Sequence, residues 1–187
     1  VLTIIESIVS KIEDSAFDTC SILSTITFAN VQSIGNYAFY NCKELTSISC
    51  SAVTSVGNYA FSGCEKLATI TMPNVGSYGD YAFENCSSLT GLTFSSTITK
   101  TGKYMLTNCS SITTTVIPSN ITIIDAGTFK GCSKLSNITL HNAITEIGES
   151  AFSDCVELTT VSLPTNLTVI SANLFSGSVK LATVEIP

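Results

Sequence analysis

The stretch Tyr37–Cys42, which reads YAFYNC, decides the fold because close copies of it recur along the chain. The copies are YAFSGC ending at Cys64, YAFENC ending at Cys86 and AFSDC ending at Cys155. A cysteine that returns at a fixed interval could be a metal ligand, half of a disulfide ladder, a reactive thiol or a packing residue. Self-similarity with a short period predicts a repeat architecture whichever of these roles applies.

The recurring cysteine divides the chain into eight units of 22 or 23 residues, so one repeat domain spans residues 1–187. Phe lies three positions before the anchor in seven units, and Leu or Ile lies three positions after it. The anchors are Cys20, Cys42, Cys64, Cys86, Cys109, Cys132, Cys155 and, in the eighth unit, Ser178. The extra residue of the longer units falls in the segment of Pro118, His141 and Pro164, which is therefore predicted to be a surface turn.

Each unit contains two patterns that are typical of strands and a compact segment between them. LTSISC and its equivalents alternate apolar and hydroxyl residues, and VTSVG at 53–57 is also extended in character. The connecting xYAFxxC is too short for a stable isolated helix and predicts one helical or 3-10 turn per unit.

A single unit cannot fold alone. Ordering 22 residues costs roughly 30 kcal/mol, which requires on the order of 1,200 Å² of apolar burial at about 25 cal/mol per Å². Coils stacked at a strand-like spacing of about 4.8 Å can supply that burial. The sequence therefore predicts a solenoid.

The consensus unit I-G-x-Y-A-F-x-x-C-x-x-L-T-S-I-x-L-P resembles the leucine-rich repeat of BspA-like surface proteins of gut and oral bacteria and parasitic protists. The match extends over essentially all 187 residues and is strong in seven units. The fifth unit departs from it at Tyr104-Met105-Leu106 and at Thr115, and the eighth has Asn173-Leu174-Phe175 and Ser178. The resemblance implies a right-handed, strand-dominated solenoid of the α/β leucine-rich-repeat type.

The same resemblance implies a non-enzymatic adhesin, secreted or on the cell surface, that engages protein or glycan ligands of a host or of neighbouring microbes. A purely structural spacer or stalk of a larger surface protein is the competing hypothesis, and ice binding by columns of Thr is a remote one. The chain begins in the middle of a repeat, so we expect it to be a piece of a longer protein. Its uncapped ends predict end-to-end self-association.

Composition argues against several other classes of function. The net charge is −6 and the 8 basic residues form no run, which disfavours nucleic-acid partners and attraction to anionic membranes. No apolar stretch approaches the length that spans a bilayer. The single histidine, His141, has no partner nucleophile at a defined spacing, and the carboxylates are scattered along the chain. We therefore expect neither catalytic residues nor a cofactor.

The anchor cysteines are predicted to form a structural ladder of buried thiols rather than a metal site. No two cysteines lie closer than Cys42 and Cys50, which are eight residues apart. Repeats in register point equivalent side chains the same way, whereas a disulfide needs its two Cβ vectors to converge. Some pairing remains an alternative. Ser178 in the same column favours a small, weakly polar group that points inward.

Two surfaces are candidates for binding. The outward residues of the first strand pattern form two hydroxyl columns, and the predicted binding residues there are Thr25, Thr27, Thr69, Thr71, Thr93, Thr139 and Thr160. The columns are interrupted by Ser47, Gly91, Val116, Asn137 and Glu185, which disfavours ice binding. Exposed Thr also suits a strand without any ligand.

A row of tyrosines is the second candidate surface. It consists of Tyr37, Tyr59, Tyr81 and Tyr104 in units two to five, where units six to eight have Gly127, Ser150 and Asn173. Each ring could pack on the next coil with its hydroxyl in water, or the row could be an aromatic interaction stripe, since Tyr is favoured at interfaces.

Overall fold

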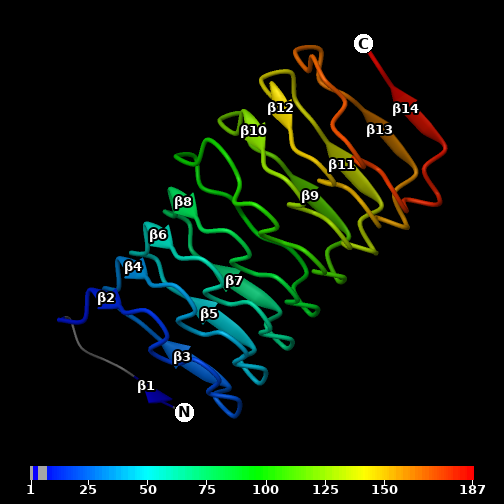
Figure 1. The fold of residues 1–187 in the computed structure, drawn as a ribbon. Helices are drawn as coiled ribbons and strands as arrows, with labels where there is room; N and C mark the ends of the chain where they lie inside the picture. The colour runs from blue at the N-terminus through cyan, green and yellow to red at the C-terminus, as the bar shows by residue number, and fades with distance from the viewer. Residues whose placement is uncertain (1, 4–7) are drawn as a thin grey trace.

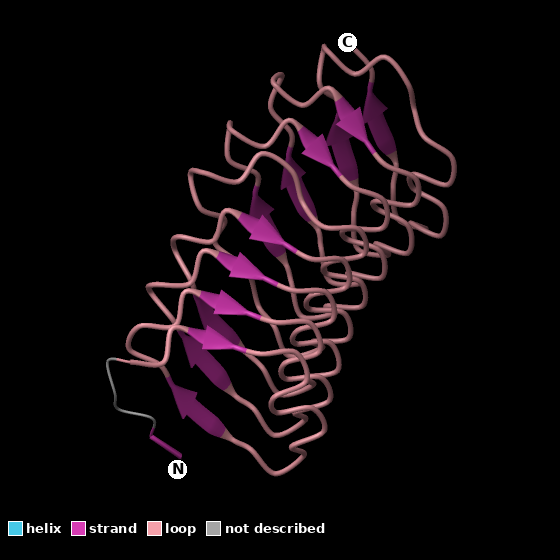
Figure 2. Cartoon of the chain, turned by 60° about the vertical axis from the view of Figure 1, so that its left-hand side comes forward, coloured by secondary structure: helices cyan, strands magenta, loops and turns pink. Residues whose placement is uncertain are grey.

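The chain forms a strand-dominated β-solenoid of about eight coils, each about 22 residues long, in a computed structural model that describes residues 2–3 and 8–187. The coils follow one another from the N-terminus to the C-terminus, which lie at opposite ends of the stack (Figure 1). Strands form two rows on opposite sides of the stack, and short loops join them at its corners (Figure 2). Among the described residues, no helix is long and apolar enough to cross a membrane.

The two rows of strands are parallel throughout. The first row contains β1 (Leu2–Thr3), β3 (Thr25–Thr27), β5 (Ser47–Ser49), β7 (Thr69–Thr71), β9 (Thr114–Val116), β11 (Asn137–Thr139), β13 (Thr160–Ser162) and β14 (Thr183–Glu185). The second row contains β2 (Lys11–Ile12), β4 (Ser33–Ile34), β6 (Ser55–Val56), β8 (Ser77–Tyr78), β10 (Ile123–Ile124) and β12 (Glu146–Ile147).

The register of the strands follows the repeat. Thr25 pairs with Ser47 and Ser47 pairs with Thr69, each 22 residues on, whereas Thr160 pairs with Thr183, 23 residues on. Equivalent residues therefore form straight columns along the stack, and the predicted solenoid is confirmed.

Both rows break near the middle of the stack and again toward its C-terminal end. The first row divides into the sheets β1-β3-β5-β7, β9-β11 and β13-β14, and residues 91–93 form no strand. In the second row, Lys100 makes only an isolated bridge to Ile123, and residues 168–170 form no strand. The expectation of two strands in every unit is therefore wrong for the fourth, fifth and eighth units. Gly91 packs no side chain against its neighbours, which weakens a strand at that point.

The corner after each second-row segment differs from the expected helical or 3-10 turn, and no helix occurs among the described residues. Tyr37 and Asn41 have φ near +54°, in the left-handed region, and equivalent residues of the other coils do too. Other residues of the corner donate their N–H groups to the carbonyl oxygen three residues before them. An example is Cys42 N–H, which bonds to Phe39 O at 3.2 Å. The left-handed residues turn their own N–H groups to the next coil, so a continuous helical turn cannot form.

The core lies between the two rows and consists of columns that continue from coil to coil. Phe61 is fully buried and stacks on Phe39 and Phe83, with ring centroids 5.1 and 5.4 Å apart. Leu106 interrupts this column, which resumes with Phe129 and Phe152 at 5.6 Å. The axial repetition of one apolar side chain explains how short units build a common core.

Candidate binding surfaces

The four tyrosines form a continuous stack along one corner of the solenoid. Successive ring centroids from Tyr37 to Tyr104 are 4.9, 4.7 and 5.0 Å apart, and the rings are within 8° of parallel. Tyr37 is exposed and the other three are partly buried. The stack ends at Gly127, which has no ring, and the ring of Tyr104 lies so close to this glycine that a Cβ atom there would collide with it.

The stack presents ring edges and hydroxyl groups rather than ring faces, because each face is covered by the next ring. Burial, followed by the neighbouring phenols, raises the pKa of Tyr59. Burial, followed by Tyr104, Glu84 and Asp80, raises the pKa of Tyr81. The phenols of Tyr59 and Tyr81 therefore stay neutral at physiological pH, and the row offers hydroxyl donors and acceptors.

Each of these tyrosines occupies a strained backbone position. The four have φ between 53° and 58°, a region that is uncommon for residues other than Gly, Asn and Asp. Other coils place Ser15, Gly127, Ser150 and Asn173 at the same corner position, with φ from 55° to 61°. The corner therefore does not require an aromatic residue.

The hydroxyl columns lie on the outer side of the first row of strands, as the spacing predicts. Thr25 and Thr27 pair with Ser47 and Ser49, which pair in turn with Thr69 and Thr71. In β11, Asn137 and Thr139 are exposed on either side of buried Ile138. Thr93 is also exposed but lies outside the strands.

Two hollows open where the first row of strands divides. One, of about 450 Å³, lies between β11 and β13 and is lined by Asn137, Thr139 and Thr160. The other, of about 430 Å³, lies between residues 91–94 and β9, with Gly91, Phe94 and Val116 in its lining. Neither hollow is lined by a charged residue. They coincide with the interruptions of the columns at Gly91, Val116 and Asn137, so the hydroxyl surface is not one flat lattice.

The cysteine column is a ladder of hydrogen bonds to the backbone. Cys64 Sγ donates to Phe39 O at 3.1 Å, and the anchors from Cys42 to Cys155 repeat this bond at 3.1–3.3 Å. Ser178 Oγ makes the same bond to Phe152 O at 2.8 Å, which explains why Ser can replace Cys there. This position therefore suits a small side chain that can donate a hydrogen bond to a carbonyl oxygen of the preceding coil.

The buried thiols of the column have little reactivity in the folded chain, because a thiol reacts as its thiolate. All eight cysteines are free, and all but Cys20 are buried. Burial raises the pKa of Cys42, Cys50 and Cys155 to about 12. Burial also raises the pKa of the remaining buried anchors above 9.0, at Cys64, Cys86, Cys109 and Cys132. No cluster of three metal-ligating side chains occurs in the part of the chain that the structure describes.

Cys20 is a correction to the predicted ladder, because its side chain is exposed. In the other coils the corner of the preceding coil covers the thiol and supplies its acceptor. The described residues include no corner before that of Cys20, so the acceptor that the other anchors use does not occur among them.

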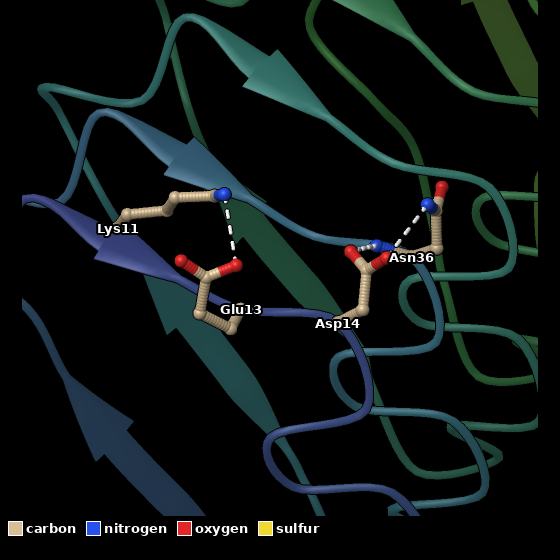
Figure 3. Close-up of polar contacts among 4 residues, drawn as sticks. All are labelled: Lys11, Glu13, Asp14 and Asn36. Carbon is tan, nitrogen blue, oxygen red and sulfur yellow. Dashed lines mark hydrogen bonds and ion pairs between the residues drawn. The ribbon is translucent and has the colours of Figure 1, made fainter.

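A ladder of Asp and Asn side chains was not predicted. Asp14 Oδ1 accepts a hydrogen bond from Asn36 N–H at 2.8 Å, and Figure 3 shows Asn36 Nδ2 close to the same carboxylate. Asn36 and Asn58 repeat this bond to the following coil, and Asp80 extends it to Lys103 N–H at 2.9 Å. The signal was an Asp or Asn every 22 residues, which follows the recurrent glycine in the coils of Asn36, Asn58 and Asp80. Asp and Asn are common in any turn, so this pattern alone does not distinguish a ladder from ordinary turns.

His141 lies in a surface turn, as expected, but it is partly buried. Its Nε2 lies 2.9 Å from the carbonyl oxygen of Pro118 in the preceding coil. The ring therefore bridges two turns, which is a structural role.

Comparison with known proteins is consistent with this architecture. Residues 2–112 and 73–182 match the family model described as BspA type Leucine rich repeat region. Among solved structures, the chain is similar to a leucine-rich repeat protein of T. pallidum, with 27% identity and a TM-score of 0.59 over 95% of this chain and 69% of that one.

Two further structures share the fold at lower identity. A leucine-rich repeat protein from Bacteroides ovatus ATCC 8483 is 21% identical, with a TM-score of 0.65 over 95% of this chain and 64% of that one. The pneumococcal vaccine antigen PcpA is 19% identical, with a TM-score of 0.52 over 95% of this chain and 60% of that one. No curated protein matches the chain.

Proposed function

Because the chain belongs to the BspA-type leucine-rich repeat family, we propose that it is a non-enzymatic binding module of a secreted or cell-surface protein. Its ligands are proteins or glycans of a host or of neighbouring microbes, and the module acts as an adhesin. The hydroxyl-rich surfaces are uncharged, so they can form hydrogen bonds with a ligand but cannot neutralise its charge. This favours a ligand without high charge.

The stacked tyrosines are the observation that carries this proposal. Tyr37, Tyr59, Tyr81 and Tyr104 occupy left-handed positions where Ser, Gly or Asn serves in other coils. Each Tyr at such a position costs on the order of 1 kcal/mol of backbone strain. Four consecutive coils thus carry a Tyr at a position where the backbone disfavours it, and the ring edges face outward. An interaction surface explains this arrangement better than the fold alone.

The proposal is tested by binding to immobilised matrix proteins and glycan arrays. A variant with Tyr59→Phe and Tyr81→Phe keeps the ring stack and removes two hydroxyl groups, so its unfolding midpoint should stay near that of the wild type. We expect this variant to lose most of its binding. A matched control with Thr69→Lys and Thr160→Lys changes the hydroxyl columns and leaves the tyrosine row intact. Equal binding by the Phe variant and the wild type would exclude the tyrosine row as the contact surface.

A structural spacer is the second candidate, and the axial ladders favour it. Thiol, Asp and Asn side chains bond each coil to its neighbour, which suits a stiff rod. If the wild type binds no matrix protein or glycan, the spacer becomes the better proposal. Ice binding has less support, because it requires an unbroken lattice of hydroxyl groups and two hollows divide this surface.

A further inference from the structure

Two adjacent strands of the first row, β11 and β13, lie next to each other without pairing. β11 is hydrogen-bonded to β9 and β13 to β14, but within the described part of the chain no backbone hydrogen bond joins β11 to β13. The junction of β5 with β7 shows what is missing. There, Ala68 N–H donates to Thr46 O and Cys50 N–H donates to Thr71 O, both at 2.9 Å.

The residues equivalent to these four line the hollow of about 450 Å³ between β11 and β13. They are Ser136, Leu140, Thr159 and Ser162. By the repeat, Thr159 N–H would donate to Ser136 O and Leu140 N–H to Ser162 O, and neither bond is made among the described residues. Because backbone donors and acceptors rarely stay unpaired, these groups are available to a molecule in the hollow.

The gap is confined to this stretch, because the two coils are tied together on both sides of it. Before the strands, Glu157 N–H donates to Ser133 O at 3.2 Å. After them, Thr165 N–H donates to Asn142 Oδ1 at 3.0 Å, and Asn166 Nδ2 donates to Asn142 O at 2.6 Å. An inserted strand needs about 4.8 Å on each side of it, and these bonds resist such a separation. The hollow therefore suits a compact ligand.

The lining of the hollow combines an apolar floor with a polar rim. Ile138 is buried and Leu140 is partly buried, whereas Asn137, Thr139 and Thr160 occupy outward positions. No charged residue lines the hollow. The amide and hydroxyl groups of the rim can both donate and accept hydrogen bonds. A matching ligand is neutral, carries several hydroxyl groups and has an apolar C–H face.

We propose that the hollow between β11 and β13 binds a neutral sugar. Its volume of about 450 Å³ is within the range of about 300–1,000 Å³ that is usual for small-molecule sites. Hydroxyl groups of the sugar bond to the N–H groups of Leu140 and Thr159 and to the rim, while the C–H face of the ring packs on Ile138. The site lies on the first row of strands, whereas the tyrosine row lies on a corner, so it does not depend on the role proposed for the tyrosines.

The second hollow, between residues 91–94 and β9, provides an internal comparison. It has a similar volume, but four apolar side chains line it, those of Leu92, Phe94, Val116 and Pro118. It offers a sugar fewer hydrogen bonds than the hollow between β11 and β13. We therefore expect no sugar to bind there.

Titration of the isotope-labelled chain with glucose, galactose, mannose, N-acetylglucosamine and lactose, followed by NMR, tests the proposal. At least one of these sugars should shift the amide signals of residues 136–140 and 159–162 to saturation, with a dissociation constant on the order of 1 mM. The signals of residues 91–94 should stay in place. The proposal is overturned if no sugar of this set shifts those signals at about tenfold that concentration. It is also overturned if an extended Val-Thr hexapeptide shifts them and the sugars do not, because the gap then binds a strand.

Substitutions locate the sugar. Thr160→Val removes one hydroxyl group of the rim at an exposed strand position and should weaken binding about three- to tenfold. Thr69→Val is the matched control, since Thr69 occupies the same column at the paired junction of β5 with β7. The variant with Tyr59→Phe and Tyr81→Phe should bind the sugar as the wild type does, so the two proposals fail separately. Equal weakening by the two Val variants would place the sugar on the hydroxyl columns in general and exclude the hollow.

Hydrogen exchange provides an independent readout. In the free chain, the N–H groups of Leu140 and Thr159 should exchange much faster than those of Cys50 and Ala68, which are paired at the equivalent positions. Addition of the sugar should slow the exchange of Leu140 and Thr159 several-fold and leave Cys50 and Ala68 unchanged. Equal protection of all four in the free chain would show that β11 and β13 pair in solution, which would remove the site.

Discussion

The coils that precede residue 91 and those that follow residue 100 share a core but differ on their surfaces. In both regions the anchor thiols reach the preceding coil and the inner apolar columns are buried. In the N-terminal region the surface features are also continuous, with four strands in each row, three of the four stacked tyrosines and the ladder of Asp and Asn side chains. In the C-terminal region the strands occur in pairs.

The difference shows that axial ladders end where one coil lacks the required group. Lys103 N–H donates to Asp80 Oδ1, but the Lys side chain has no oxygen to offer the following coil, so the Asp and Asn ladder stops. The tyrosine stack stops at Gly127 in the same way. Beyond these ladders, the hydroxyl groups of Thr101 and Thr128 form a hydrogen bond inside the corner, with their Oγ1 atoms 2.8 Å apart.

The core columns cross the boundary because the inserted residue of the longer coils lies outside them. The anchor keeps its apolar neighbours three positions before and three positions after it in every coil. A solenoid of this kind therefore tolerates a change of repeat length in a turn while its core stays in register.

The largest effect is expected from alkaline pH, which acts on the thiol column that both regions share. The folded pKa of each buried thiol lies above its ordinary value, and at Cys42 and Cys155 it reaches about 12. Stability is therefore complete below the unfolded pKa of about 8.5 and falls as the pH rises toward the folded pKa. The loss approaches about 1.4 kcal/mol per thiol per pH unit.

Urea unfolding at pH 8, 9 and 10 under reducing conditions measures this loss. Both regions should lose hydrogen-exchange protection together. Cys64→Ser, which copies the arrangement of Ser178, should reduce the pH dependence by the share of one thiol. A stability that does not change over this range would contradict the burial of the column.

Substitution of Phe61 by Ala should destabilise the chain by about 3–5 kcal/mol, because the fully buried ring stacks on both sides. Phe129→Ala is the matched change in the C-terminal region, where Leu106 leaves only one stacking partner. We expect a cost smaller by about 1 kcal/mol, the value of one aromatic pair. Equal costs from urea unfolding would show that ring stacking adds nothing to apolar burial.

Replacing Tyr59 and Tyr81 together by Ser should destabilise the N-terminal region by about 2 kcal/mol, since all three stacking contacts of the row are lost. Relief of backbone strain opposes this loss only in part, because Ser15 and Ser150 adopt the same left-handed geometry. Hydrogen exchange should locate the effect in the coils before residue 91. An unchanged unfolding midpoint would indicate that the stack serves a ligand alone.

The smallest effect is expected from the Asp and Asn ladder. Asn58→Ala removes the acceptor of Asp80 N–H and should cost about 1 kcal/mol. Asn142→Ala, which removes the isolated bond from Thr165 N–H at 3.0 Å, is the control from the C-terminal region. A larger loss for Asn58 would show that a continuous ladder strengthens its members, and equal losses would show that the bonds act singly.

The columns of the core and of the first-row surface could be predicted because a solenoid converts sequence period directly into position. Once Cys42 and Cys64 were aligned, Ser47 had to lie beside Thr69. The stacking of the tyrosines also follows from this alignment, because equivalent residues of adjacent coils are neighbours.

The corner conformation and the breaks could not be predicted in the same way. The left-handed φ of Tyr37 is set by hydrogen bonding to the next coil, which local propensity does not describe. Gly91 and Thr115 were visible as irregularities, but whether they divide the row of strands depends on the packing of both neighbouring coils. The thiol bond to Phe39 O depends on side-chain direction, which the period alone leaves open.

The bonding of each corner to the next coil has a mechanical consequence. A pull on the two termini loads the junctions between coils in series, so the rod should peel one coil at a time from an end. Each released coil of about 22 residues would lengthen the chain by about 70 Å, because an extended residue spans about 3.4 Å and the stacked coil contributes only about 4.8 Å. Single-molecule stretching should record regular steps of that size. A surface protein built this way would extend coil by coil under shear before any covalent bond breaks.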